Sequence, residues 1–74
     1  MKVEIRCYAT LSKYAPKDGV LELFENANVK DVLDKLNLHE KDVKVVFVNG
    51  IHARFDTKLK DGDRVAFFPA VGGG

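Results

Sequence analysis

Only one segment of this chain has a helical period, and it lies between segments that alternate like strands. In residues 28–37, NVKDVLDKLN, apolar residues recur at i, i+3, i+4 and i+7, namely Val29, Val32, Leu33 and Leu36. Asn28 is a good N-cap, and Asp31 suits the positive end of a helix. The sequence therefore predicts one main helix, and any sheet that forms must pack against its apolar face.

The remaining segments show the period of two that is typical of half-buried strands. In residues 1–9, MKVEIRCYA, we expect Val3, Ile5 and Cys7 to face inward. Residues 20–25 form a second strand, and RVAFFP at 64–69 forms the last. Two further strand-like pieces lie within VKVVFVNGIHAR, on either side of the NG dipeptide.

Turn residues separate these strands. Asn49-Gly50 favours a type I′ hairpin, because both central residues need a positive φ. KDG at 17–19 and DGD at 61–63 are also typical of turns. We expect Thr10 to cap a single helical turn that Pro16 ends, and we expect strand pairing to fail at Pro69, which lacks an N–H.

The element order is strand, strand, helix, strand, strand, strand. A chain of 74 residues has room for one core, which one helix packed across one face of one sheet can supply. This order predicts an α+β fold of the β-grasp (ubiquitin-like) type, with a mixed five-stranded sheet. We expect a single domain over residues 1–74, with a flexible C-terminal tail over residues 70–74.

Composition excludes several classes of protein. Twelve basic and 11 acidic residues leave a formal charge of +1, which gives no electrostatic basis for binding nucleic acid. The longest apolar runs are too short to span a membrane, and no signal-peptide pattern opens the chain. A single cysteine excludes an internal disulfide and a CxxC metal site. These features predict a cytoplasmic protein that contacts neither membrane nor nucleic acid.

The side chains do not form a recognisable catalytic or metal site. His39 and His52 lie on different segments, without other ligands at suitable spacing, so we expect no metal. Cys7 has the inward parity of the first strand and is expected to pack in the core. Acids such as Asp42 and Asp56 are dispersed along the chain, without the pairing that acid–base catalysis needs.

The chain stops on FFPAVGGG, residues 67–74, and its three final glycines cannot pack in a core. Residues 70–74 can extend about 17 Å at roughly 3.3–3.6 Å per residue, beyond a globule with a radius of gyration near 11 Å. Glycine has no side chain to obstruct a narrow cleft. Either the terminus is frayed, as many are, or its carboxylate enters a partner protein. Composition slightly favours the second interpretation, in which the carboxylate enters a partner protein.

The segments LKDGDRVAFFPAVGGG at 59–74 and VNG at 48–50 resemble the ubiquitin-like sulfur carriers of the MoaD/ThiS type. The resemblance is closest to the branch that contains the small subunit of molybdopterin synthase. It extends over the whole chain through the β-grasp order and is weaker before residue 45. Family tails often have a second proline where this chain has Ala70. Gly72 stands directly before the terminal Gly-Gly pair, so the third glycine is a substitution in the family pattern and not an extension of it.

The resemblance implies a mechanism in which the chain carries sulfur and is not itself an enzyme. A ubiquitin-activating-type enzyme would use ATP to adenylate the carboxylate of Gly74, and sulfur would then replace the adenylate as a thiocarboxylate. The tail, with Gly73 and Gly74 at its tip, would enter the large synthase subunit. There the sulfur would pass to a pyranopterin precursor of the molybdenum or tungsten cofactor. No cofactor would be bound by the chain itself.

The partner interface is expected on the sheet face opposite the helix. Strand parity places Tyr8 and Phe68 on that face, and the family's third, usually apolar, position falls on His52. The interface is expected to continue into the tail through Pro69, Val71 and Gly72. Other readings remain open: a sulfur carrier for thiamin or cysteine synthesis, a ubiquitin-like protein modifier, or a binding module with an inert tail.

Overall fold

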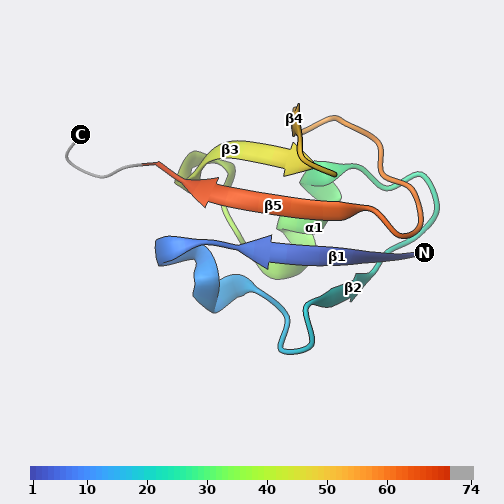
Figure 1. Ribbon diagram of the computed structural model, residues 1–74, viewed down its shortest axis with the longest axis horizontal. Helices are drawn as coiled ribbons and strands as arrows, with labels where there is room; N and C mark the ends of the chain where they lie inside the picture. Colours follow the sequence, from blue (N-terminus) through green and yellow to red (C-terminus); the bar gives the residue numbers. More distant parts are fainter. Residues whose placement is uncertain (71–74) are drawn as a thin grey trace.

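A computed structural model describes residues 1–70 of the chain, so the predicted roles of Val71, Gly72, Gly73 and Gly74 lie outside the described residues. Within residues 1–70, five strands, one α-helix and two 3-10 helices (η) follow one another (Figure 1). In order they are β1 (Lys2–Cys7), η1 (Ala9–Tyr14), β2 (Val20–Glu22), α1 (Val29–Leu36), η2 (Glu40–Asp42), β3 (Val43–Val48), β4 (Ile51–Ala53) and β5 (Arg64–Pro69). This is the predicted order.

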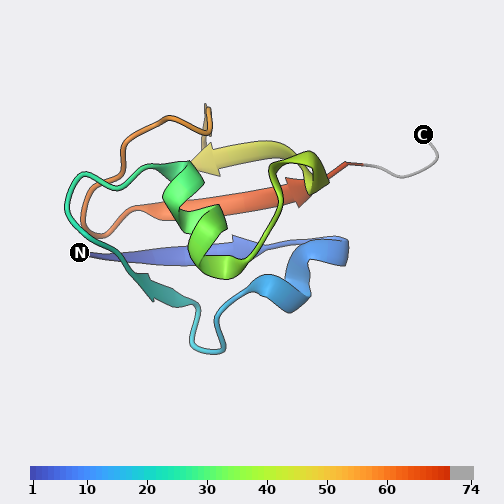
Figure 2. The same cartoon turned by 180° about the vertical axis from the view of Figure 1, so that it is seen from behind.

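The five strands form one mixed sheet in the order β2-β1-β5-β3-β4. The two central strands, β1 and β5, run parallel, whereas β1–β2, β3–β4 and β3–β5 are antiparallel pairs. Helix α1 lies across one face of this sheet, seen in front of the strands in Figure 2. Within residues 1–70, no α-helix covers the other face, which is turned toward the viewer in Figure 1. The predicted α+β, ubiquitin-like architecture is confirmed.

Helix α1 begins as its sequence predicts. The side chain of Asn28 accepts a hydrogen bond from the Asp31 N–H at 3.0 Å, and the Asp31 carboxylate accepts from the Asn28 N–H at 2.8 Å. These reciprocal bonds form a capping box. The helix ends at Asn37, which adopts the left-handed conformation with φ 60°. Local side chains therefore define both ends of the helix.

The core lies between α1 and the sheet. It contains 14 buried apolar residues: Val3, Ile5, Leu11, Leu23, Ala27, Val29, Val32, Leu33, Leu38, Val43, Val46, Leu59, Val65 and Phe67. The helix contributes Val29, Val32 and Leu33 from its predicted apolar face, and Leu36 packs at the edge of the core. No buried polar or charged side chain is present in the described part of the chain.

The DGD turn connects the last strand to its neighbours. Asn49 and Gly50 have φ values of 54° and 81°, as a type I′ hairpin requires. The Asn49 side chain donates to the Asp63 carboxylate at 2.9 Å and accepts from the Arg64 N–H at 3.0 Å. Asp61 accepts from the Lys2 N–H at 2.8 Å. Two turns that are distant in sequence are thus fixed against each other and against β1.

Three details differ from the sequence predictions. Thr10 caps nothing: η1 begins after Tyr8, without a side-chain cap, so Thr10 lies inside it. Strand β2 ends at Glu22, three residues before the predicted end. The prediction for Pro69 was wrong, because Pro69 pairs with Val43 across a register shift, and proline retains its carbonyl acceptor.

Within residues 1–70, no helix is long and apolar enough to cross a membrane.

Candidate functional site

Two aromatic residues stack on the sheet face opposite α1. On β5, Phe67 is fully buried in the core, so its neighbour Phe68 points to the other face. Tyr8 directly follows β1, and its N–H donates to the Phe67 carbonyl at 3.1 Å, which brings Tyr8 beside Phe68. The two rings are parallel within 3°, with centroids 4.6 Å apart. The predicted placement of this pair is confirmed.

A third ring extends the pair across the sheet. Phe47 on β3 packs edge-on against Phe68, with centroids 5.6 Å apart and an interplanar angle of 89°. It also packs edge-on against His52 on β4, at 5.8 Å and 78°. Tyr8, Phe68, Phe47 and His52 therefore form one continuous line of rings across β1, β5, β3 and β4. We call these four residues the aromatic row.

Phe47 was not predicted as a site residue, although the sequence contains a signal for it. In a two-residue hairpin at Asn49-Gly50, Phe47 and His52 are directly opposite partners, and the structure pairs them in that register. Opposite partners lie on the same face of a sheet. Because His52 was predicted on the interface face, its pairing with Phe47 across the hairpin predicts Phe47 on the same face.

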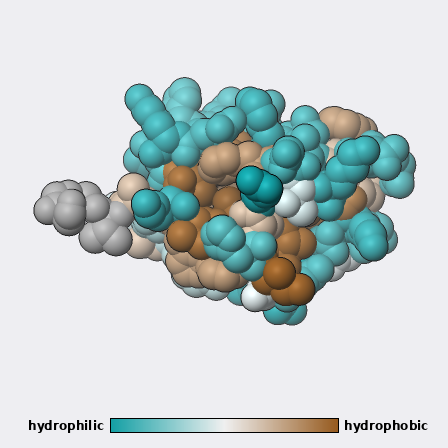
Figure 3. Space-filling model, turned by 90° about the horizontal axis from the view of Figure 1, so that it is seen from above, coloured by the Kyte–Doolittle hydropathy of each residue, from teal (hydrophilic) through white to brown (hydrophobic). Residues whose placement is uncertain are grey.

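The aromatic row has partly buried central rings, exposed ends and a charged border. Tyr8 is 44% exposed and His52 is also exposed, while Phe47 and Phe68 are partly buried. Along the same face, Glu4 forms ion pairs with Arg6 at 3.9 Å and with Arg64 at 3.7 Å. An aromatic centre with a polar rim is the usual composition of a protein–protein interface. Viewed from above, apolar surface shows between polar groups, some of it near the end where the described chain stops (Figure 3).

Two members of the aromatic row, Tyr8 and Phe68, lie at the end of the sheet from which the chain leaves. Pro69 is the last residue of β5, and the Ala70 N–H donates to the Asp42 carbonyl at 3.4 Å. Because Phe68 directly precedes Pro69, a protein that binds the aromatic row also lies next to residues 69 and 70. Figure 1 shows β5 pointing toward this end of the molecule.

The remaining candidate residues do not form a catalytic group. His39 lies at the start of η2, whereas His52 is on β4. Cys7 is half-buried against the core, and desolvation by burial raises the pKa of its thiol. Within residues 1–70, no three His, Cys, Asp or Glu side chains gather to hold a metal ion. The described surface is suited to recognition of another protein.

A sequence model of the ThiS family matches residues 5–74. Among solved structures, a protein assigned as molybdopterin converting factor subunit 1 from Pyrococcus furiosus is 31% identical, with a TM-score of 0.74. This similarity covers 96% of this chain and 99% of that one. No protein with a curated description matches the sequence closely enough to count as a relative.

Two further structures are similar to this chain. SAMP1, a small archaeal modifier protein from Haloferax volcanii, is 25% identical, with a TM-score of 0.74 and 100% of both chains covered. A complex of subunits 1 and 2 of the molybdopterin-converting factor from Helicobacter pylori contains a chain that is 26% identical, with a TM-score of 0.60. That similarity also covers 100% of both chains. The likeness thus reaches both cofactor-synthesis subunits and a protein modifier.

Proposed function

The chain belongs to the ThiS family of ubiquitin-like sulfur carriers, and from this premise we propose that it is the sulfur-carrying small subunit of a molybdopterin synthase. The observation that carries this proposal is the aromatic row, which includes Phe68, the residue directly before Pro69, where β5 ends and the Gly-rich terminus follows. A recognition surface and a reactive terminus are thereby presented together to one partner. The chain itself catalyses no step.

Activation of the terminus is required by its chemistry. A free α-carboxyl group has a pKa of about 3.3–3.7, so at neutral pH it is an unreactive anion. An oxygen of the Gly74 carboxylate would attack the α-phosphate of ATP in the activating enzyme and release pyrophosphate. A sulfur nucleophile would then displace AMP, leaving a thiocarboxylate at Gly74. The described part of this chain would act by holding that terminus in the partner's active site.

The large synthase subunit is the proposed acceptor protein. The similar H. pylori chain was solved as a complex with subunit 2, which gives a precedent for such a pair. Stacked aromatic residues provide large, rigid contact area and are enriched among residues that dominate binding energy. We propose that Tyr8, Phe47 and Phe68 bind the large subunit while the terminus, reaching about 17 Å, enters its cleft.

A second function uses the same terminus and the same activation. The similarity to SAMP1 favours a protein modifier, in which the Gly74 carboxylate is joined to lysine side chains of other proteins. Sister carriers that supply sulfur for thiamin or cysteine synthesis are further alternatives within the sulfur-carrier class. These functions differ in the acceptor of the activated carboxylate, so the acceptor has to be identified directly.

The proposed function is tested by intact mass spectrometry of the protein purified from its own host without a C-terminal tag. We expect a fraction heavier by one oxygen-to-sulfur exchange, which an alkylating reagent labels at Gly74. Incubation with the large subunit and a pyranopterin precursor should convert this fraction back to the carboxylate. A variant with one alanine added after Gly74 is the control and should never acquire sulfur.

Two results would contradict the proposal. If the protein retains its carboxylate after incubation with ATP, a sulfur donor and the host's activating enzyme, it is not a sulfur carrier. If the thiocarboxylate forms but the large subunit leaves it unchanged, the chain serves another sulfur-transfer pathway. Attachment of the chain to lysines of host proteins, detected in the same samples, would instead establish the modifier function.

A further inference from the structure

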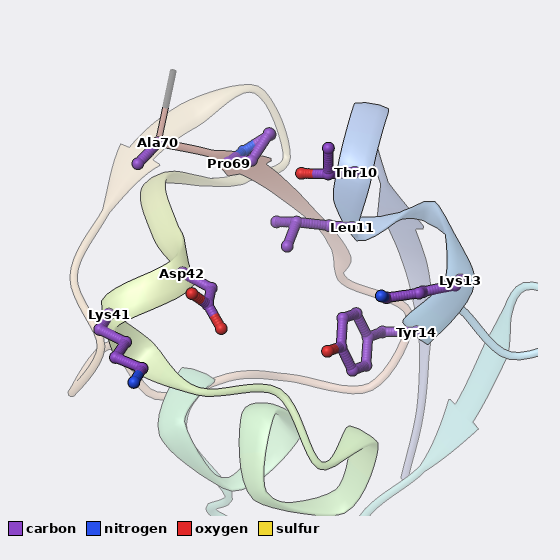
Figure 4. A pocket seen from close by; sticks show the side chains of 8 residues that line it. All are labelled: Thr10, Leu11, Lys13, Tyr14, Lys41, Asp42, Pro69 and Ala70. Atoms are coloured by element: carbon purple, nitrogen blue, oxygen red, sulfur yellow. The ribbon is translucent and has the colours of Figure 1, made fainter. Parts of the chain in front are cut away.

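A hollow of about 270 Å³ opens beside the point where the described chain stops. Its walls come from three separate segments: η1, η2 and the end of β5 (Figure 4). Leu11 and Pro69 supply apolar surface, and Tyr14 and Asp42 supply polar groups. Ala70 completes the border. We call this hollow the root pocket, because the C-terminal residues begin at its edge.

Asp42 presents an unpaired carboxylate to the root pocket. Figure 4 shows this carboxylate directed into the hollow, facing the hydroxyl of Tyr14 from the opposite wall. The side chain of Asp42 forms no hydrogen bond or ion pair with any other residue among residues 1–70. Asp42 and Tyr14 are both partly buried. A shielded carboxylate without a partner can gain a charge-assisted hydrogen bond from an incoming cation.

The position of Asp42 is fixed relative to the chain end. Its backbone carbonyl accepts a hydrogen bond from the Ala70 N–H at 3.4 Å, and the next residue, Val43, pairs with Pro69. The root pocket therefore stays at the same place beside residues 69 and 70. A protein that contacts residues 69 and 70 therefore lies next to this pocket.

Two lysines at the rim leave the carboxylate free. The Lys13 ammonium lies 5.5 Å from the centroid of the Tyr14 ring, in a cation–π arrangement. Lys41 does not reach across the hollow in Figure 4. Neither lysine forms an ion pair with Asp42 among the described contacts. The pocket thus combines an available carboxylate with an aromatic ring that already accepts a cation.

We propose that the root pocket binds a basic side chain, best matched by arginine, of the protein that accepts sulfur from the terminus. A guanidinium group can pair with the Asp42 carboxylate through two N–H donors while its plane packs against the Tyr14 ring. This inference rests on the proposed function and adds a contact to it that is separate from the aromatic row. It would set the direction in which the terminus enters the acceptor.

The test compares the binding of full-length variants to the host's purified large subunit by isothermal titration calorimetry. We expect Asp42→Asn to weaken binding about tenfold, as loss of one charge-assisted contact implies. The matched control is Asp56→Asn, which removes the same charge from the exposed loop between β4 and β5 at the far end of the sheet. It should leave binding unchanged. Tyr14→Phe, which keeps the ring, should weaken binding only two- to threefold.

Partner variants identify the basic residue. If Asp42 pairs with an arginine of the large subunit, replacing that arginine with alanine should weaken binding to the wild-type chain but not to Asp42→Asn. Such non-additivity in a double-mutant cycle measures direct contact. The affinity of the wild-type chain should also depend more steeply on salt concentration than that of Asp42→Asn.

Several outcomes would overturn the inference. Equal affinities of wild type and Asp42→Asn, or equal losses in Asp42→Asn and Asp56→Asn, would exclude a specific contact at the pocket. Tighter binding by Asp42→Asn together with weaker binding by Lys13→Met would show that the pocket receives an acidic group. In both cases the thiocarboxylate assay would still give its own result for the proposed function. If the wild type does not bind the large subunit, the inference and the proposed acceptor both fail.

Discussion

At the scale of single residues, Cys7 is a group whose chemistry depends on its burial. Burial raises the pKa of its thiol, so the folded chain holds less thiolate than a free cysteine at the same pH. We expect alkylation of Cys7 at pH 7.5 to be several-fold slower in the folded protein than in denaturant. A thiocarboxylate at Gly74 should react first. A mass-spectrometric time course measures both rates, with Cys7→Ser as the control.

The same shift in pKa has a consequence for stability. The unfolded thiol ionises first, so the unfolded chain loses its proton while the folded chain retains it. Stability should therefore fall as pH rises through about 8.5, the ordinary pKa of a thiol. The difference in melting temperature between wild type and Cys7→Ala should change in favour of the variant above that pH. A constant difference from pH 7 to pH 10 would show that burial does not affect the thiol.

The carboxylate of Asp63 connects two turns through hydrogen bonds. It accepts from the Asn49 side chain at 2.9 Å and from the Lys60 N–H at 2.7 Å. Asp63→Ala removes both bonds and should lower the free energy of unfolding by about 1–2 kcal/mol, measured by urea denaturation. Asp61→Ala, in the same turn, removes one exposed bond to Lys2 and should cost less. The reverse order would mean that Asp63 does not connect the turns.

At the scale of elements, two adjacent residues of strand β5 have different roles. Phe67 stabilises the fold, and Phe68 belongs to the proposed binding surface. Phe67 is fully buried, so Phe67→Ala should destabilise the protein by about 3–5 kcal/mol. Phe68 lies on the open face, so Phe68→Ala should leave a folded protein that binds the large subunit more weakly. Thermal unfolding and calorimetry measure the two effects. A Phe68→Ala variant with normal binding would exclude the aromatic row from the interface.

The sequence predicted the elements that have local signals. The N-cap at Asn28 and the positive φ values at Asn49 and Gly50 depend on neighbours within three residues, and both predictions are confirmed. Thr10 was misassigned as a cap, because η1 starts without a side-chain cap and the sequence pattern at its start has no distinctive residue. Tertiary contacts, and not local propensity, position this short helix.

The candidate site could be predicted only in part. Tyr8 and Phe68 follow from strand parity, but Asp42 lies in a short 3-10 helix without a periodic pattern. Its proximity to residues 14 and 70 arises because β3 pairs with β5 and η1 follows β1. These contacts join segments more than 25 residues apart, and no local pattern in one sequence specifies them. Because Asp42 is distant in sequence from the other residues of the root pocket, the pocket could not be predicted from the sequence.

At the scale of the whole molecule, the sheet is least protected at its edges. Strands β2 and β4 have three residues each and pair on one side, whereas β1, β5 and β3 pair on both. Amides of Val65 and Phe67 should therefore exchange with solvent most slowly, near the rate set by global unfolding. Hydrogen exchange followed by NMR gives the order. Protection of β4 equal to that of β5 would show that the sheet opens only as a unit.

The parallel pairing of β1 with β5 has a consequence for synthesis of the protein. Strand β5 lies between β1 and β3, yet it is the last of the five strands to be translated. Until residues 64–69 have left the ribosome, β1 and β3 have no strand between them and the aromatic row lacks Phe68. A chain that lacks residues 64–69 can thus complete neither the sheet nor the aromatic row. The central position of β5 makes completion of both depend on the last strand to be translated.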